Sequence, residues 1–238
     1  MAKYLIGVLV LVFAATAAMY FFVGVSQIYK EVGPNQGLPH YFKDPSQSIA
    51  KINLTAFYFV PKNKQDRAIA NWQEVLEANL KKVQEFHNFQ LQERSDFSYQ
   101  IYPEIVIGEH ENIFYDTDVT QHGNPEALRG IAEELKKRML FGKDSGNEYR
   151  VALIMYEGVG ASGGGNIALV SRVFLTDSRY GAVSSSILAH EFYHTLGLPD
   201  AYILETSAPT SEDIMGLGRE RPIERAFIGR KTLNELGI

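Results

Sequence analysis

Two histidines and a glutamate, placed close together, are the residues of this chain best suited to metal chemistry. His190 and His194 stand four residues apart in the pattern HExxH, and Glu191 follows the first of them. Residues four apart lie on the same face of an α-helix, so both imidazoles can reach one ion. Glu191 is then the natural general base for a metal-bound water. Because so short a pattern also arises by chance, the flanking residues have to support it.

A catalytic zinc ion needs a third protein ligand and one open position. The chain has no cysteine, and no histidine follows His194, so a third ligand from downstream must be a carboxylate. Gly197 can end the helix in a left-handed conformation, and Pro199 prevents the helix from resuming. We therefore expect a sharp turn that returns Asp200 to the ion; an ordinary helix stop with Asp200 as a cap is the simpler alternative. Glu212, 18 residues after His194, is the competing ligand, but it leaves the turn unexplained.

The segment HEFYHTLGLPD, with Tyr202 shortly after it, resembles the zinc-binding motif HExxHxxGxxD of the metzincin peptidases. It is most similar to the small bacterial snapalysin-type group, and the resemblance extends over residues 187–202. It implies that three side chains hold Zn²⁺ and that one carboxylate serves as the base. These residues are His190, His194 and Asp200 as ligands and Glu191 as the base.

The same resemblance points to a methionine and a tyrosine. Metzincins have a methionine in a tight turn beneath the metal, and Met215, in the sequence DIMG, is the candidate. An ordinary core methionine is the alternative. Many metzincins also have a tyrosine two residues after this methionine, where this chain has Leu217. Tyr202 is a possible substitute for it in steadying the transition state, a point that the sequence leaves open.

Periodicity and turn residues predict the elements that position this motif. Strands are expected at residues 51–60, 98–107, 149–156 and 167–175, and helices at 66–90, from 124 onward, at 183–196 and at 222–236. Pro103 places a bulge or a sheet edge inside the second strand. Strands that alternate with helices predict an α+β or α/β domain. The resemblance implies a metzincin-type catalytic domain: a twisted mixed sheet with helices packed on it, an edge strand lining the cleft, and an active-site helix ending at a glycine.

A glycine-rich segment before the motif needs separate treatment. Residues 158–163 match the dinucleotide-binding pattern GxGxxG, but more glycine and a β-rich run follow where that pattern requires a helix. A nucleotide site is therefore rejected in favour of a loop, residues 158–166, that shapes access to the cleft. In metzincins an edge strand just before the active-site helix pairs with the extended substrate. Residues 167–172 occupy that place in the chain, and we expect them to form this edge.

The N-terminus predicts a membrane anchor. Residues 4–25 are an uncharged, almost wholly apolar run, long enough to cross the ~30 Å hydrocarbon core as a helix. Lys3 before it gives a slight positive-inside bias, which places the remainder outside the cytoplasm. The alternative is a signal peptide cleaved near Ala17, with secretion. We expect an anchor at 1–25, a linker or arm at 26–50 and the peptidase domain at 51–238; whether the arm, through His40 and Asp44, covers the cleft is open.

Composition narrows the function further. The net charge of −5 argues against a nucleic-acid partner, and the absence of cysteine excludes disulfides, a thiol nucleophile and a cysteine plug. Four arginines near the C-terminus are expected on a solvated helix face: Arg219, Arg221, Arg225 and Arg230. The sequence predicts a membrane-tethered, zinc-dependent endopeptidase that cleaves peptide or protein substrates. The alternative is a catalytically inactive zinc-binding domain that acts in binding or envelope assembly. The sequence says nothing of the oligomeric state.

Overall fold

The computed structural model describes residues 37–120, 123–141, 148–203 and 208–238. Residues from Leu38 to Ile238 form one compact unit, so residues 38–50 of the expected arm are part of the folded domain. The predicted membrane segment, residues 1–25, lies outside the described residues. In the part of the chain that is described, no helix has the length and apolar character needed to cross a membrane.

Five strands form the central sheet in the order β4-β3-β5-β7-β6. β3 (Lys51–Val60) pairs in parallel with β4 (Asp96–Ile107) and β5 (Tyr149–Tyr156), and β5 pairs in parallel with β7 (Ile167–Ser171). The short strand β6 (Ala161–Gly164) runs antiparallel to β7 and forms one edge. An α+β domain with a mixed sheet is therefore confirmed.

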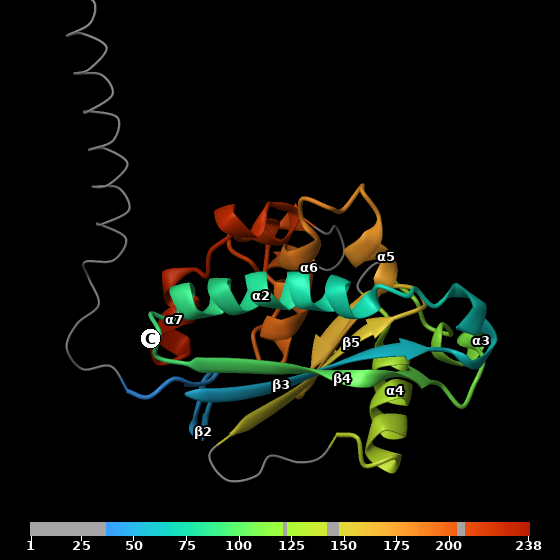
Figure 1. Cartoon of the computed structure of the whole chain (residues 1–238). Helices are drawn as coiled ribbons and strands as arrows, with labels where there is room; N and C mark the ends of the chain where they lie inside the picture. The colour runs from blue at the N-terminus through green and yellow to red at the C-terminus, as the bar shows by residue number, and fades with distance from the viewer. Residues whose placement is uncertain (1–36, 121–122, 142–147, 204–207) are drawn as a thin grey trace, which may run out of the picture. The chain divides into compact units, whose positions relative to one another are not determined.

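Helices cover both faces of this sheet (Figure 1). α2 (Trp72–Gln90) and α6 (Ser184–His194) lie on one face, and α4 (Pro125–Lys137) lies on the other. Successive side chains of a strand point to opposite faces, so β3 supplies both hydrophobic cores. Its inward residues are Leu54, Ala56 and Tyr58 in the core of α2 and α6, and Phe57 and Phe59 in the core of α4. The buried character of β3 and β5 on both sides is typical of strands covered by helices on each face.

Two features in the first half of the chain, the start of α2 and the irregularity in β4, can be compared with the sequence predictions. The helix expected at 66–90 begins at Trp72, because the preceding polar residues, none of them buried, form a 3₁₀ turn instead, η1 (Lys62–Arg67). Pro103 lies in β4, which is an edge strand, and the pairing with β3 shifts register between Ala56 and Tyr58. The prediction of a bulge or an edge at Pro103 is thus confirmed.

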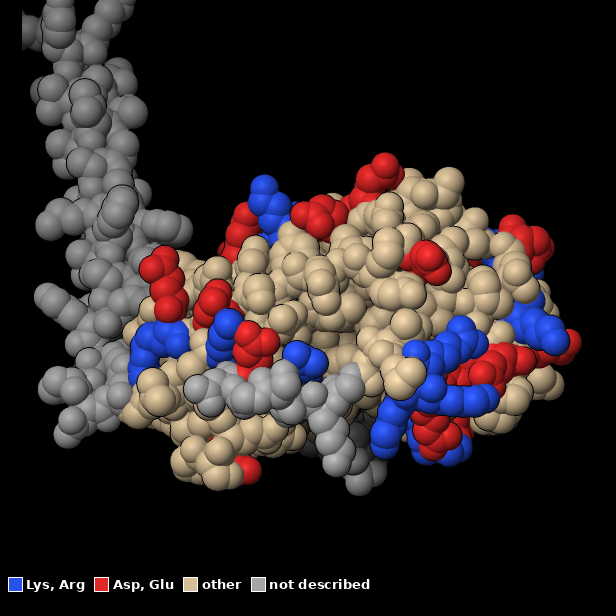
Figure 2. All heavy atoms as spheres, turned by 60° about the horizontal axis from the view of Figure 1, so that its bottom comes forward, with Lys and Arg blue, Asp and Glu red and all other residues tan. Residues whose placement is uncertain are grey.

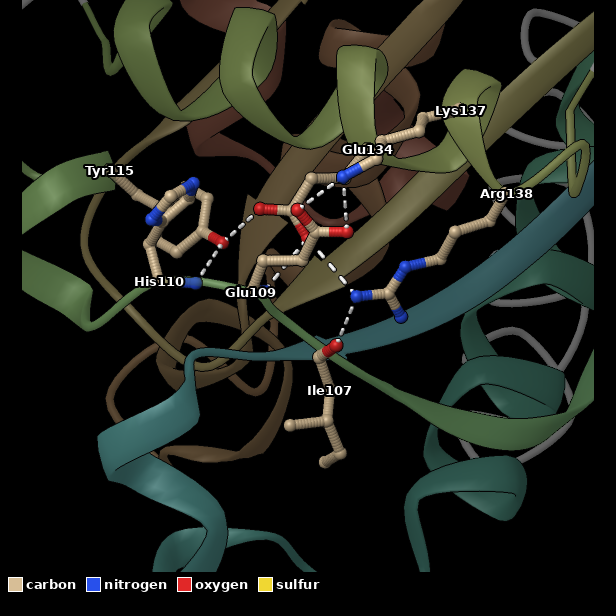
Figure 3. A network of polar contacts seen from close by, with 7 residues as sticks. All are labelled: Ile107, Glu109, His110, Tyr115, Glu134, Lys137 and Arg138. Atoms are coloured by element: carbon tan, nitrogen blue, oxygen red, sulfur yellow. Dashed lines mark hydrogen bonds and ion pairs between the residues drawn. The ribbon is translucent and has the colours of Figure 1, made fainter.

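A buried carboxylate ties α4 to the end of β4 (Figure 3). Glu134 accepts hydrogen bonds from the Tyr115 hydroxyl, from the backbone N–H of Glu109 at 3.0 Å and from Arg138 at 3.4 Å. Arg138 also donates to the carbonyl of Ile107 at 2.8 Å. Tyr115 ends the short helix α3 (Asn112–Tyr115), so a single carboxylate joins three segments of the chain. Burial and this acceptor raise the pKa of the Tyr115 phenol, which therefore remains a donor.

The surface around α4 carries charges of both signs. Figure 2 shows Lys and Arg side chains interspersed with Asp and Glu on the face that it presents. Ion pairs account for such mixing along α4, where Arg129 contacts Glu126 and Glu133, and Lys137 contacts Glu109. Such exposed pairs are worth little to stability. They do mean that Arg129 and Lys137 of α4 are balanced locally by acidic side chains.

Two predictions in the second half of the chain are wrong. The strand expected at 167–175 ends at Ser171, whose hydroxyl accepts from the N–H of Val173 and begins the helix α5 (Arg172–Thr176). The helix expected at 222–236 is broken into η3 (Ile223–Arg225) and α7 (Arg230–Glu235). The chain between them is held away from helical geometry because the N–H of Ile214 donates to the carbonyl of Phe227 at 2.8 Å.

The described part of the arm is a small hairpin that supports the end of α6. It consists of β1 (His40–Tyr41) and β2 (Asp44–Ser48), paired antiparallel. The N–H of Phe42 donates to the carbonyl of Leu196 at 2.9 Å, which joins the hairpin to the chain just after α6. Asp44 is exposed and accepts from Ser46, so its carboxylate is used within the hairpin itself. A second short hairpin, β8 (Tyr202–Ile203) and β9 (Ala208–Pro209), follows Asp200.

Candidate metal centre

The HExxH residues lie where the sequence predicts, at the end of α6. This helix packs against α2 on one side and against β6 and β7 on the other. Most of its apolar residues, Leu188 and Phe192 among them, are fully buried, so the helix is fixed by core packing. His190 and Glu191 are also buried, and His194 is half-buried. The motif therefore projects from a rigid element, as a preorganised metal site requires.

Backbone carbonyls fix the orientation of both imidazoles. Nδ1 of His190 lies 2.9 Å from the carbonyl oxygen of Ile214, and Nδ1 of His194 lies 2.8 Å from that of Leu198. A carbonyl oxygen only accepts, so each Nδ1 carries the proton and each Nε2 is left with a free lone pair in the neutral ring. The two Nε2 atoms face one another at 3.2 Å. This is the arrangement of second partners that is typical of metal-binding histidines.

Asp200 completes the group. Its Oδ1 lies 3.2 Å from Nε2 of His190 and 3.2 Å from Nε2 of His194. This oxygen is buried, and in the described part of the chain no hydrogen-bond donor satisfies it. Three acceptor atoms thus point at one another, which is unfavourable unless a cation lies between them. The group of His190, His194 and Asp200 could therefore hold a metal ion.

The competing ligand is placed elsewhere. Glu212 has an exposed side chain and forms an ion pair with Arg221, and it does not belong to the group around His190. The carboxylate that the structure brings to the two histidines is that of Asp200, through the turn expected at Gly197. The N–H of Gly197 donates to the carbonyl of His194 at 3.0 Å, and Gly197 has a φ of 86°, in the left-handed region. The sequence therefore correctly predicted the turn that brings Asp200 back to the two histidines.

The pKa values of Asp200, Glu191 and His194 are all shifted from their usual values by burial and by one another's charges. Burial acts to raise the pKa of Asp200, but the facing imidazoles and the Tyr202 hydroxyl lower it far more, so the carboxyl is ionised. Burial raises the pKa of Glu191, against a lowering by the charges of His190 and His194. Burial lowers the pKa of His194, yet its contacts with Asp200 and Glu191 raise it overall. A buried carboxyl with a raised pKa is the form in which enzymes hold a general base near neutral pH.

The turn predicted around Met215 is present and touches the site through its backbone. The N–H of Gly216 donates to the carbonyl of Asp213 at 2.9 Å, and the N–H of Met215 donates to Oδ1 of Asp213 at 3.1 Å. The residue between them, Ile214, offers the carbonyl that orients His190. The sequence indicated the methionine, but it missed the buried Asp213 that shapes the turn and the carbonyl of Ile214 that contacts His190. No side-chain pattern marks a carbonyl for such a role.

Two side chains after Asp200 form an outer layer around it. The Tyr202 hydroxyl hydrogen-bonds with the Asp200 carboxyl. The guanidinium of Arg219, in η2 (Leu217–Glu220), lies over the Tyr202 ring with Cζ 4.4 Å from its centroid. The expectation that Arg219 lies on a solvated helix face is therefore wrong. Arg221, by contrast, pairs with a glutamate as expected.

The strand beside the helix is not the one expected. β7 pairs with β5 on one side and with β6 on the other, so residues 167–172 do not form the edge. The edge is β6, within the segment that the sequence assigned to a loop. A β-carbon on Gly163 would collide with the backbone carbonyl of Glu191 and with Cβ of His194. Glycine at this position therefore lets the edge strand lie directly against the metal-site turn of α6.

Comparison with models of protein families finds no match for this chain. Comparison with curated proteins also finds no significant match. The candidate site is therefore defined by its own residues and by their geometry.

Proposed function

We propose that this protein is a zinc-dependent endopeptidase, tethered to a membrane by its N-terminal segment. One observation carries the proposal: two imidazole nitrogens and one carboxylate oxygen converge at 3.2 Å, next to a buried glutamate. The likeness of this segment to the metzincin motif, and an antiparallel edge strand beside the helix, support the same class of enzyme. The apolar run of residues 4–25 supports the tether, with the catalytic domain outside the cytoplasm. Secretion after signal cleavage is the alternative location.

Zinc fits the three ligands better than a harder ion does. A tetrahedral ion with bonds of about 2.0–2.1 Å holds its ligands ~3.4 Å apart, close to the 3.2 Å between these atoms. Two neutral imidazoles with one carboxylate suit zinc, whereas magnesium and calcium prefer oxygen donors. Three protein ligands also leave one position for water or substrate, which distinguishes catalytic from structural zinc sites.

In this proposal Glu191 and Asp200 have separate roles in peptide hydrolysis. His190, His194 and Asp200 would hold the zinc ion, which would supply Lewis acidity and lower the pKa of bound water toward ~7. Glu191 takes a proton from the attacking water and later delivers it to the leaving amine. Its burial supports this role, because a raised pKa makes the proton transfers in both directions accessible. Asp200, which is hydrogen-bonded to Tyr202, faces both histidines and would be the third ligand.

Strand β6 is the element suited to hold the substrate. The N–H of Ser171 donates to the carbonyl of Gly160, so alternate residues from Gly160 onward face β7. Gly163 then directs its backbone groups to the open edge, beside Glu191 and His194. An extended peptide can pair with these groups through its own backbone, which binds many sequences with little regard to side chains.

Zinc content and peptide cleavage, measured on the full chain in detergent, test the proposal. We expect one zinc ion per chain, cleavage of unstructured peptides, and loss of cleavage after treatment with a chelator. Glu191→Gln should retain zinc and lose turnover. Zinc bound without any cleavage by the parent protein would favour an inactive binding domain, and equal cleavage by the variant would remove Glu191 from the role of base.

A further inference from the structure

A positive charge lies at the edge of this acidic site. Arg219 is half-buried, and its guanidinium is held over the ring of Tyr202, with which it also hydrogen-bonds. Tyr202 in turn contacts Asp200, so the guanidinium is two contacts from the ligand carboxylate. The charge of Arg219 also acts on Glu191, whose pKa it lowers. Arg219 and the proposed base are therefore close enough for their charges to interact.

Unlike Arg221 two residues away, Arg219 has no acidic partner among the described residues. Arg221 pairs with Glu212, Arg172 with Glu157, and Arg179 with Asp177. Among the described residues, no carboxylate lies within ion-pair distance of the Arg219 guanidinium. A guanidinium offers five N–H donors, and the hydrogen bond to Tyr202 uses only part of that capacity.

The chemistry of a guanidinium indicates what it would bind. Its planar fork matches a carboxylate and can form two parallel charge-assisted hydrogen bonds. With a zinc ion bound, the charge of the ion balances the charges of Glu191 and Asp200. A fixed cation at this point changes that balance for groups that bind close to it.

We propose that Arg219 is a specificity-determining residue that binds a carboxylate of the peptide substrate close to the scissile bond. This inference rests on the proposed peptidase function and adds to it a class of substrate: peptides with an acidic group beside the cleavage site. The carboxylate belongs either to an internal Asp or Glu side chain or to the C-terminus of a short substrate. Both sources share the same chemistry and are separated by the choice of peptides.

The test compares matched peptides on the zinc-loaded full chain in detergent. A randomised peptide library, read by mass spectrometry, first gives the cleaved bond. Peptides with Glu or Gln on each side of that bond, and with a free or amidated C-terminus, are then compared by kcat/KM. We expect the acidic peptide to be preferred by roughly tenfold to a hundredfold, the range of a charge-assisted hydrogen-bonded pair. An effect of Glu identifies an internal side chain, and an effect of amidation identifies the terminus.

Variants assign this preference to one residue. Arg219→Gln should abolish it, so that acidic and neutral peptides are cleaved with equal kcat/KM, and Arg219→Glu should reverse it in favour of Lys. Arg219→Lys, which retains the charge, should retain part of it. The matched control is Arg221→Gln, which removes the same charge two residues away and should keep the full preference. Equal cleavage of acidic and neutral peptides by the parent overturns the proposal, as does a uniform loss with Arg219→Gln.

A binding measurement keeps this result distinct from the fate of the proposed function. Fluorescent peptides with Glu or Gln are titrated into Glu191→Gln and into Glu191→Gln combined with Arg219→Gln, both loaded with zinc. Tighter binding of the acidic peptide, lost in the double variant, supports the role of Arg219 even if the parent cleaves nothing. Equal binding of the two peptides overturns it even if cleavage is efficient.

Discussion

The ring of Tyr41 lies against Gly197, in the space that a β-carbon on this glycine would occupy. Gly197 has a φ of 86°, so a side chain at this position meets both backbone strain and a steric obstacle. The contact joins two distant parts of the chain, the N-terminal hairpin and the turn after α6. The hairpin therefore supports the turn that returns Asp200 to the histidines.

Gly197→Ala should weaken both the fold and the metal site. The left-handed backbone and the collision with Tyr41 together cost roughly 2–4 kcal/mol of unfolding free energy. Because the turn carries Asp200, we expect the zinc affinity to fall as well. Urea unfolding and a competition assay with a chromophoric chelator measure the two effects. Gly37→Ala is the control, since a β-carbon on that glycine would meet no atom within 4 Å.

A double variant separates the two causes. Tyr41→Ala combined with Gly197→Ala relieves the collision but leaves the backbone strain, so part of the lost stability should return relative to Gly197→Ala alone. Stability of Gly197→Ala equal to that of the parent would contradict the importance of this contact.

Asp200→Asn should lower the zinc affinity by more than the roughly 10–100-fold typical of outer-shell changes, because it alters a direct ligand. In the metal-free protein the same variant should cost little stability, because the amide can donate to an Nε2 and relieves the opposition of three acceptors. Glu212→Gln provides the matched control and should leave zinc affinity unchanged. Calorimetric titration with zinc measures both. An unchanged zinc affinity of Asp200→Asn would mean that another residue is the third ligand.

Local signals explain why this part of the site could be predicted from the sequence. The histidine spacing is a property of one helix, and the break at Gly197 and Pro199 is a property of six residues that follow it. Neither depends on contacts between distant segments. The arginine at position 219 could not be placed in this way, because its contact with Tyr202 arises from the folding of two separate turns.

The misplaced elements depend on long-range pairing. β6 contains two glycines in its four residues and therefore has no alternating side chains that would indicate a strand. It is a strand because β7 pairs with it. Residues 226–229 have helical neighbours in the sequence, but the hydrogen bond between Ile214 and Phe227 holds them extended. In both cases a partner that is remote in sequence decides the backbone conformation.

His87 should make the protein sensitive to mild acid. It lies on α2 and is fully buried, where its Nδ1 lies 3.2 Å from the hydroxyl of Tyr193 in α6 and its Nε2 has no partner among the described residues. Burial lowers the pKa of His87 from 6.5 to about 3. Protons therefore bind the unfolded chain first, and the free energy of unfolding falls as the pH drops below 6.5. The slope from this group reaches ~1.4 kcal/mol per pH unit and ends near the folded pKa.

His87→Gln isolates this contribution. Glutamine is neutral throughout and can still bond to the Tyr193 hydroxyl, so the difference in stability between parent and variant should narrow steadily from pH 7 to pH 4. Urea midpoints in the same metal state at each pH give that difference. A difference that does not change with pH would show that His87 titrates alike in the folded and unfolded chains.

Gly163 and Gly164 give the sharpest test of the edge strand, because they are adjacent and differ in their surroundings. A β-carbon on Gly163 meets the carbonyl of Glu191 and Cβ of His194, whereas one on Gly164 meets nothing within 4 Å. Gly163→Ala must therefore push β6 away from α6 or displace the turn of α6 that carries Glu191 and His194. We expect kcat/KM to fall by at least roughly tenfold, since small misplacements at a reacting centre can cost a hundredfold. Gly164→Ala should leave kcat/KM within a few-fold, and equal kinetics for both variants would remove β6 from the substrate cleft.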